Sequence, residues 1–96
     1  MAATSFGSVG LVNTQLNINQ PIVLKKGAGA VIEAVVTLAG STAGAIYDAA
    51  TTGGGSTGSL IATLPNTVGP IAISFPCQTG ITVVPGSGQC ISVAYQ

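Results

Sequence analysis

The chain has few side chains that could carry out chemistry. Glu33 and Asp48 are its only carboxylates, Cys77 and Cys90 are its only thiols, and it contains no histidine. Ser-His pairs, Cys-His pairs and His-based metal sites are therefore excluded. One carboxylate pair remains, but glycoside hydrolysis would need a cleft holding the two groups roughly 5–9.5 Å apart. A small β domain rarely offers such a cleft, so we expect no enzymatic activity and no small-molecule substrate.

The glycine-rich segments do not have the form of cofactor sites. Gly27-Ala28-Gly29 precedes a predicted strand, and Ile32 stands where a dinucleotide fingerprint has its third glycine. The segment Ala49 to Ser59, AATTGGGSTGS, has no lysine after its last glycine, as a phosphate-binding loop requires. We therefore expect no bound cofactor.

Asp48 and its neighbour Tyr47 are better explained as structural residues. We expect the Asp48 carboxylate to accept hydrogen bonds from loop amides and to fix the start of the glycine-rich loop. The alternative, a calcium ligand, would need six to eight oxygens, and the chain has few other carboxylates. Tyr47 and Tyr95 could stack on a sugar, but we expect both to lie against the core, with their hydroxyl groups at its rim.

Only 4% of the residues are charged, and the formal net charge is zero. Two adjacent lysines, Lys25 and Lys26, cannot neutralise the several phosphates that nucleic-acid binding uses, so we expect no nucleic-acid partner. They are best interpreted as solvated charges at a strand end. A neutral, charge-poor surface promotes association, so we expect an oligomer or a component of an assembly.

Membrane insertion and export are not indicated. The most apolar window, Ala28 to Ala39, is about half of the roughly 20 residues that a membrane helix needs, and it contains Glu33. No basic segment followed by an apolar one is present at the start of the sequence. The expected site of synthesis is a reducing cytoplasm. Cys77 and Cys90 are either two small buried thiols or a disulfide, formed after release, that would stabilise the fold by about 3 kcal/mol.

The apolar residues recur with the two-residue period of β-strands. In Leu11 to Asn19, one face carries Val12, Leu16 and Ile18. The longest apolar run, Gly29 to Asp48, predicts a hairpin of two strands. We expect its core face to hold Ile32, Ala34, Val36 and Leu38. We expect the opposite face, with Val31, Glu33 and Val35, to be covered by another subunit or by a loop.

Short strands are also predicted at 22–24, 60–64, 71–75, 81–84 and 89–95, the last two as a hairpin around Pro85 to Gly88. No segment has a capped helical stripe. The prediction is a single all-β domain, a small jelly-roll-like β-sandwich of about eight antiparallel strands. Residues 1–20 form an extended arm and the first strand, and residues 21–96 form the sandwich. The candidate interface residues are Phe6, Leu11, Val31, Glu33 and Val35.

Several segments, in this order, resemble a group of small β domains in virion proteins of tailed bacteriophages and prophages. The similarity covers about Ile22 to Tyr95. The segments that carry it are Lys26 to Ile32, Ala45 to Asp48, Leu60 to Pro65, Gly80 to Val84 and Ile91 to Tyr95. The cysteines have no counterpart in this resemblance, which therefore says nothing about their pairing.

The resemblance implies a head decoration, or cement, protein on the exterior of the capsid. Proteins of this type are jelly-roll-like homotrimers that clamp neighbouring major capsid proteins at three-fold and quasi-three-fold positions. Similar domains also occur in fibres and tails, so the alternative is a fibre or tail module that recognises host surface glycans. A further alternative is a bacterial surface or pilus-like subunit that polymerises by strand exchange.

Overall fold

In the part of the chain that the structure describes, the fold is an antiparallel β-sandwich of eight strands. The computed structural model describes residues 12–53 and 59–96, so Phe6, Leu11 and most of the predicted arm lie outside the described residues. The strands in chain order are β1 (Asn13–Ile18), β2 (Ile22–Lys26), β3 (Gly29–Leu38), β4 (Gly44–Tyr47), β5 (Leu60–Leu64), β6 (Gly69–Cys77), β7 (Gly80–Val84) and β8 (Cys90–Tyr95). The all-β prediction is confirmed.

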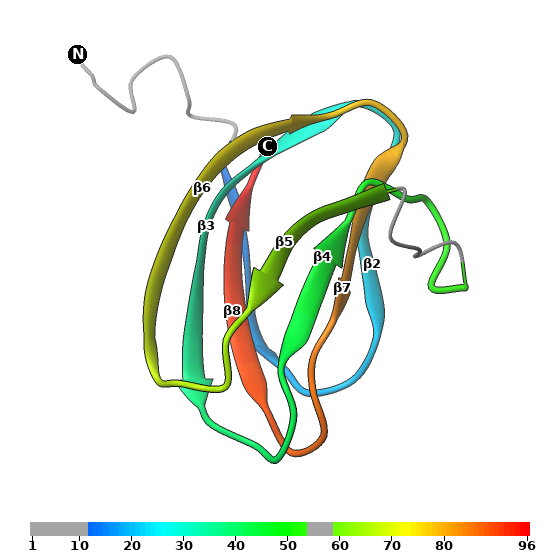
Figure 1. The fold of residues 1–96 in the computed structure, drawn as a ribbon. Coiled ribbons are helices and arrows are strands. Elements are labelled where there is room, and N and C mark those ends of the chain that lie inside the picture. Colours follow the sequence, from blue (N-terminus) through cyan, green and yellow to red (C-terminus); the bar gives the residue numbers. More distant parts are fainter. Residues whose placement is uncertain (1–11, 54–58) are drawn as a thin grey trace, which may run out of the picture.

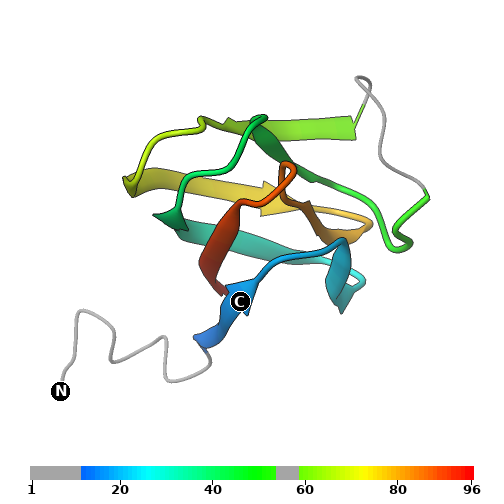
Figure 2. The ribbon, with the colours of Figure 1, turned by 90° about the horizontal axis from the view of Figure 1, so that it is seen from below.

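The strands form two four-stranded sheets, in the orders β1-β8-β3-β6 and β2-β7-β4-β5, and every pairing is antiparallel. Eight strands in two sheets connected in this way form a jelly roll. The last strand, β8, lies between β1 and β3 (Figures 1 and 2). Strands distant in sequence are therefore neighbours in the first sheet, and loops between consecutive strands usually cross from one sheet to the other.

The two predicted hairpins are wrong. β3 and β4 lie in different sheets, and so do β7 and β8. The connecting loops bond to each other: the backbone N–H of Ser41 donates to the Ser87 carbonyl oxygen at 2.8 Å, and the N–H of Ser87 donates to Thr42 Oγ1 at 2.8 Å. Turn residues end these strands as expected. The chain then crosses from one sheet to the other because the two connecting loops form hydrogen bonds with each other.

The core lies between the two sheets. Its buried side chains come from both, and the cluster contains Ile18, Val31, Ala34, Ile46, Leu64, Cys77, Ile81, Val83, Ile91 and Val93. Thr82 is also buried, although its neighbours Ile81 and Val83 face the core. Its hydroxyl donates to the Ala49 carbonyl oxygen at 2.8 Å, so the start of the glycine-rich loop covers the opposite side of β7.

The predicted faces of β3 are partly wrong because β3 has one residue more than β8 at two places, between Val31 and Glu33 and between Val36 and Leu38. Such a bulge reverses the alternation of the side chains. Val31 is consequently fully buried in the core and cannot be an interface residue, whereas Leu38 is 54% exposed. Ala34 and Val36 are buried as predicted, and Ile32, at the first bulge, is half-buried.

A third bulge changes the direction of Leu16. Between Gln15 and Ile18, β1 has one residue more than β8, and Asn17 there adopts a positive φ of 57°. Ile18 faces the core as predicted, but Leu16 is 66% exposed. Leu16 and Leu38, both expected in the core, thus lie on the outside of the same sheet.

Candidate functional site

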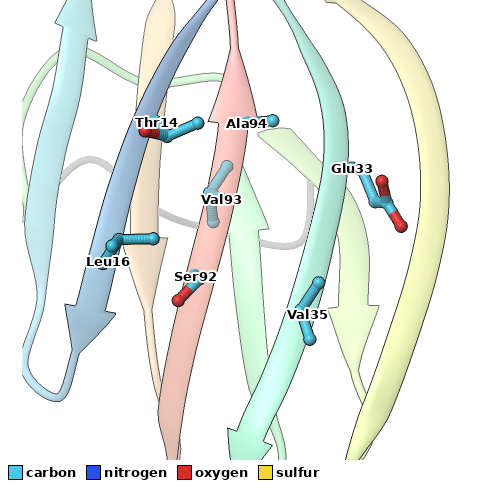
Figure 3. Close-up of a pocket in the computed structure, with 7 residues that line it drawn as sticks. All are labelled: Thr14, Leu16, Glu33, Val35, Ser92, Val93 and Ala94. Atoms are coloured by element: carbon cyan, nitrogen blue, oxygen red, sulfur yellow. The ribbon is translucent and has the colours of Figure 1, made fainter.

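The outward surface of the first sheet is the candidate site, and we call it the outer face. Strand register places its side chains: Ala34 and Val93 are opposite each other and buried, so their neighbours Glu33, Val35, Ser92 and Ala94 point outward. The face includes Thr14 and Leu16 from β1, Glu33, Val35 and Leu38 from β3, and Cys90, Ser92 and Ala94 from β8. The edge strand β6 adds Pro70 and Ala72, which lie opposite Val35 and Glu33. Figure 3 shows most of them in place.

The centre of the outer face is a shallow depression of about 180 Å³. Its lining residues are Thr14, Leu16, Glu33, Val35, Ser92, Val93 and Ala94 (Figure 3). Pockets that enclose small ligands usually measure roughly 300–1,000 Å³, so this one is too small and too open to enclose such a molecule. A shallow depression of this size is suited to contact with another protein surface.

Among the described residues that line the depression, Glu33 is the one ionisable group. It is exposed, and its opposite neighbours are Ala72 on β6 and Ala94 on β8, neither of which can pair with a carboxylate. Among the described residues Glu33 forms no ion pair and accepts no hydrogen bond. The sequence predicted that Glu33 and Val35 lie on the face of β3 opposite the core. Both lie there, Glu33 exposed and Val35 half-buried.

Asp48, directly after β4, has the structural role predicted for it. Its Oδ1 accepts the backbone N–H of Thr79 at 2.7 Å, of Gly80 at 3.1 Å and of Gln78 at 3.2 Å. The N–H groups of Gln78 and Thr79 lower the pKa of the Asp48 carboxyl because they stabilise its charged form. Asp48 also donates its own N–H to the Ser59 carbonyl oxygen at 2.8 Å. It therefore fixes both the β6–β7 turn and the two ends of the glycine-rich loop.

The two tyrosines differ in location. Tyr95 is half-buried and packs against the core, as expected. Tyr47 follows the buried Ile46 on β4 and lies opposite Thr82, on the side of the second sheet that faces away from the core. The prediction that its ring lies at the core is wrong, because alternation along β4 places Ile46 inside instead.

The two cysteines are both free, so the predicted alternative of a disulfide is wrong. Cys77 is opposite Gly29 and Cys90 is opposite Leu38, at the two ends of β3. Nine residue steps at about 3.3 Å each separate them by roughly 30 Å, far beyond the reach of a bridge. Burial raises the pKa of the Cys77 thiol, and the negative charge of Asp48 adds to this effect.

Sequence reasoning missed Leu16 and Leu38, which form the most exposed apolar part of the outer face. The one local signal was Asn17, since asparagine accepts a positive φ more readily than most residues. No helix in the described part of the chain is long and apolar enough to cross a membrane. Within residues 12–53 and 59–96, no three His, Cys, Asp or Glu side chains form a group that could hold a metal ion.

Comparisons with protein-family models, with curated proteins and with solved structures found no match to this chain.

Proposed function

We propose that the chain is a structural virion protein that decorates the head of a tailed bacteriophage and acts by binding alone. The observation that carries the proposal is the outer face, where two β-bulges turn Leu16 and Leu38 away from the core. The jelly-roll strand order and the order of the sequence segments that resemble phage virion domains support it further.

The energetics favour an assembly. Burying a Leu or Val side chain contributes about 1.5–3 kcal/mol, and Leu16, Val35 and Leu38 are all available on one surface. Contiguous exposed apolar patches on small proteins commonly mark interaction sites. With two cations and two anions in 96 residues, the surface has little charge to keep copies or partners apart.

The mechanism is burial of surface across the joints between major capsid proteins. A specific interface covers about 800 Å² on each partner. Closed three-fold symmetry repeats each contact, so a homotrimer seated at a three-fold position binds several capsid subunits at once. The protein thereby holds neighbouring capsomers together on the capsid exterior without any chemical step.

The test is co-sedimentation of the purified protein with heads of the encoding phage that lack it. Saturable binding is expected, together with a native mass of three chains. A variant without residues 1–10 is expected to bind heads or trimerise more weakly, because the arm is predicted to contact a neighbour. Absence of binding to heads at any protein concentration would overturn the proposal.

The alternative of a glycan-binding fibre or tail module has less support. Sugar recognition usually relies on an aromatic side chain with an exposed ring, and the residues that line the depression on the outer face include no aromatic one. Selective binding on a glycan array, without binding to heads, would favour this alternative.

A further inference from the structure

We propose that the outer face binds a second copy of this chain in a head-to-tail contact, in which Lys26 of one copy pairs with Glu33 of the next. This inference deepens the proposed function, because it names the surface through which the decorating protein associates with itself. The partner is identified by charge complementarity, by the apolar residues around Glu33, and by the exposed Phe75 at the end of the molecule that carries Lys26.

Charged side chains are scarce in this protein. The chain has four charged residues, and Asp48 already accepts three backbone N–H groups. Glu33 is left without a partner among the described residues, and so is Lys26, which is exposed at the end of β2. Lys25 is half-buried, and its side chain lies next to Gly29. Of the two lysines, both within the described residues, Lys26 is the more exposed, and it is the cation that we expect a second copy to present.

A two-fold stacking of the outer face on itself is unfavourable. It would bring the two Glu33 carboxylates together over an apolar floor, and none of the residues that line the depression is a cation. Like charges that face each other across an interface cost free energy and suppress that arrangement. A head-to-tail contact avoids the repulsion because each Glu33 then meets a lysine.

The end of the sandwich that carries Lys26 also offers apolar surface. Lys26 is opposite Gly80, Gly29 is opposite Cys77, and Phe75 precedes Cys77 by two residues on β6. The ends of β2 and β6 accordingly lie at the same end of the molecule (Figure 1). Phe75 is 49% exposed, and its ring can cover Leu16 and Val35 of the neighbouring copy.

The geometry of such a contact leads to rings. The two surfaces are different, so each copy uses its outer face for one neighbour and its Lys26 end for the other. When the rotation between copies closes, the result is a cyclic oligomer, and three copies match the proposed trimer. Because the contact includes a charge pair near water, it is expected to weaken as salt rises.

The experiment is sedimentation of wild-type protein and charge-swap variants over a range of concentrations, at low and high salt. We expect Glu33→Lys and Lys26→Glu each to weaken self-association on the order of tenfold or more, since each places like charges together. The double variant with both changes restores the pair in reversed order and is expected to associate nearly as the wild type does. Thr63→Lys, at an exposed position on β5, is the control and is expected to have no effect.

Two results would overturn the inference: a wild-type protein that stays monomeric at all concentrations, or a double variant that associates no better than the single ones. Co-sedimentation with heads separates this outcome from failure of the proposed function. Monomers that bind heads refute the contact and retain the function. Charge-swap rescue in a protein that does not bind heads confirms the contact and refutes the function. Urea unfolding of each variant verifies that the exposed substitutions leave the fold intact.

Discussion

The backbone N–H of Asn17 donates to the hydroxyl oxygen of Ser92 across 3.4 Å, where β1 carries one residue more than β8. The bulge reverses the side-chain alternation, so Gln15 points inward and Leu16 outward. β1 is also an edge strand of its sheet, and a bulge there interrupts the backbone ladder that another chain could extend. The bulge at Asn17 therefore places Leu16 on the outer face and also disfavours non-specific strand pairing at this edge.

The positive φ of Asn17 predicts a specific order of stability among its variants. Asn17→Ala is expected to be about 1 kcal/mol less stable than Asn17→Gly, because a β-carbon is unfavourable in the left-handed region and glycine has none. Urea unfolding of both variants measures the difference. Equal stability would show that the bulge does not need this backbone conformation.

Asp48 is predicted to stabilise the turn between β6 and β7. Asp48→Ala removes the acceptor of the Gln78, Thr79 and Gly80 N–H groups, and we expect it to lower the free energy of unfolding by about 1 kcal/mol. Asp48 is only half-buried, which keeps the effect at the low end of the range for charged hydrogen bonds. Asp48→Asn retains one uncharged acceptor and should lose less. Equal stability of Asp48→Ala and the wild type in urea would contradict this role.

The lowered pKa of Asp48 predicts acid sensitivity. In the unfolded chain this carboxyl has its ordinary pKa of about 4, and backbone N–H groups lower the pKa in the folded protein. The stabilisation is thus complete above about pH 4 and is lost as the pH falls through the folded pKa. Urea midpoints measured from pH 7 down to pH 2 should show this loss in the wild type and less of it in Asp48→Asn.

Glu33→Gln is the matched control for the pH series. Glu33 accepts no hydrogen bond from the described residues, so this variant is expected to keep the acid-dependent loss of stability. If Asp48→Asn and Glu33→Gln gave the same pH profile as each other, the assignment to Asp48 would be incorrect.

Gln89 is predicted to be the most sensitive polar residue of the core. Its side chain is fully buried, with Oε1 accepting the Gly86 N–H at 2.9 Å and Nε2 donating to the Pro65 carbonyl oxygen at 3.0 Å. Gln89→Leu keeps the volume but leaves these backbone groups without partners, which should cost about 3 kcal/mol. The exposed Gln78→Leu is the control and should change stability by no more than about 0.5 kcal/mol. Similar unfolding midpoints for the two variants would argue against a structural role for the buried amide.

The stability of the protein is predicted to be independent of redox conditions. A reducing agent should leave the melting temperature unchanged, because the thiols lie at opposite ends of β3. In the native protein, half-buried Cys90 should react with a thiol reagent before buried Cys77. An intact mass lower by two hydrogens under oxidising conditions would reveal an intramolecular bridge and contradict the register.

The strands were predictable because alternating β-branched residues and turn residues act locally. The strand at 71–75 and the strand at 60–64 were recognised from their own residues, and both are present. Which side chains of a strand face the core was less predictable, since a single extra residue at Asn17 or Thr37 reverses the alternation. Sequence periodicity alone does not distinguish a regular strand from a bulged one.

The pairing of the strands depends on contacts far apart in sequence. Pro85 to Gly88 has the composition of a hairpin turn, yet the chain crosses between the sheets there. The crossing is held by Gln89 bonded to Pro65 and by Ser87 bonded to Thr42, partners that are 24 and 45 residues away. The role of Asp48 was predictable because it needs only a carboxylate at a loop, whereas the identity of its amide donors was not.

We propose that the protein decorates phage heads. Electron cryo-microscopy of heads that lack the protein, after incubation with the purified chain, would show whether it binds them and where. We expect added density at three-fold and quasi-three-fold positions, into which jelly rolls fit with the outer face covered. Heads without added density at saturating protein concentration would contradict it.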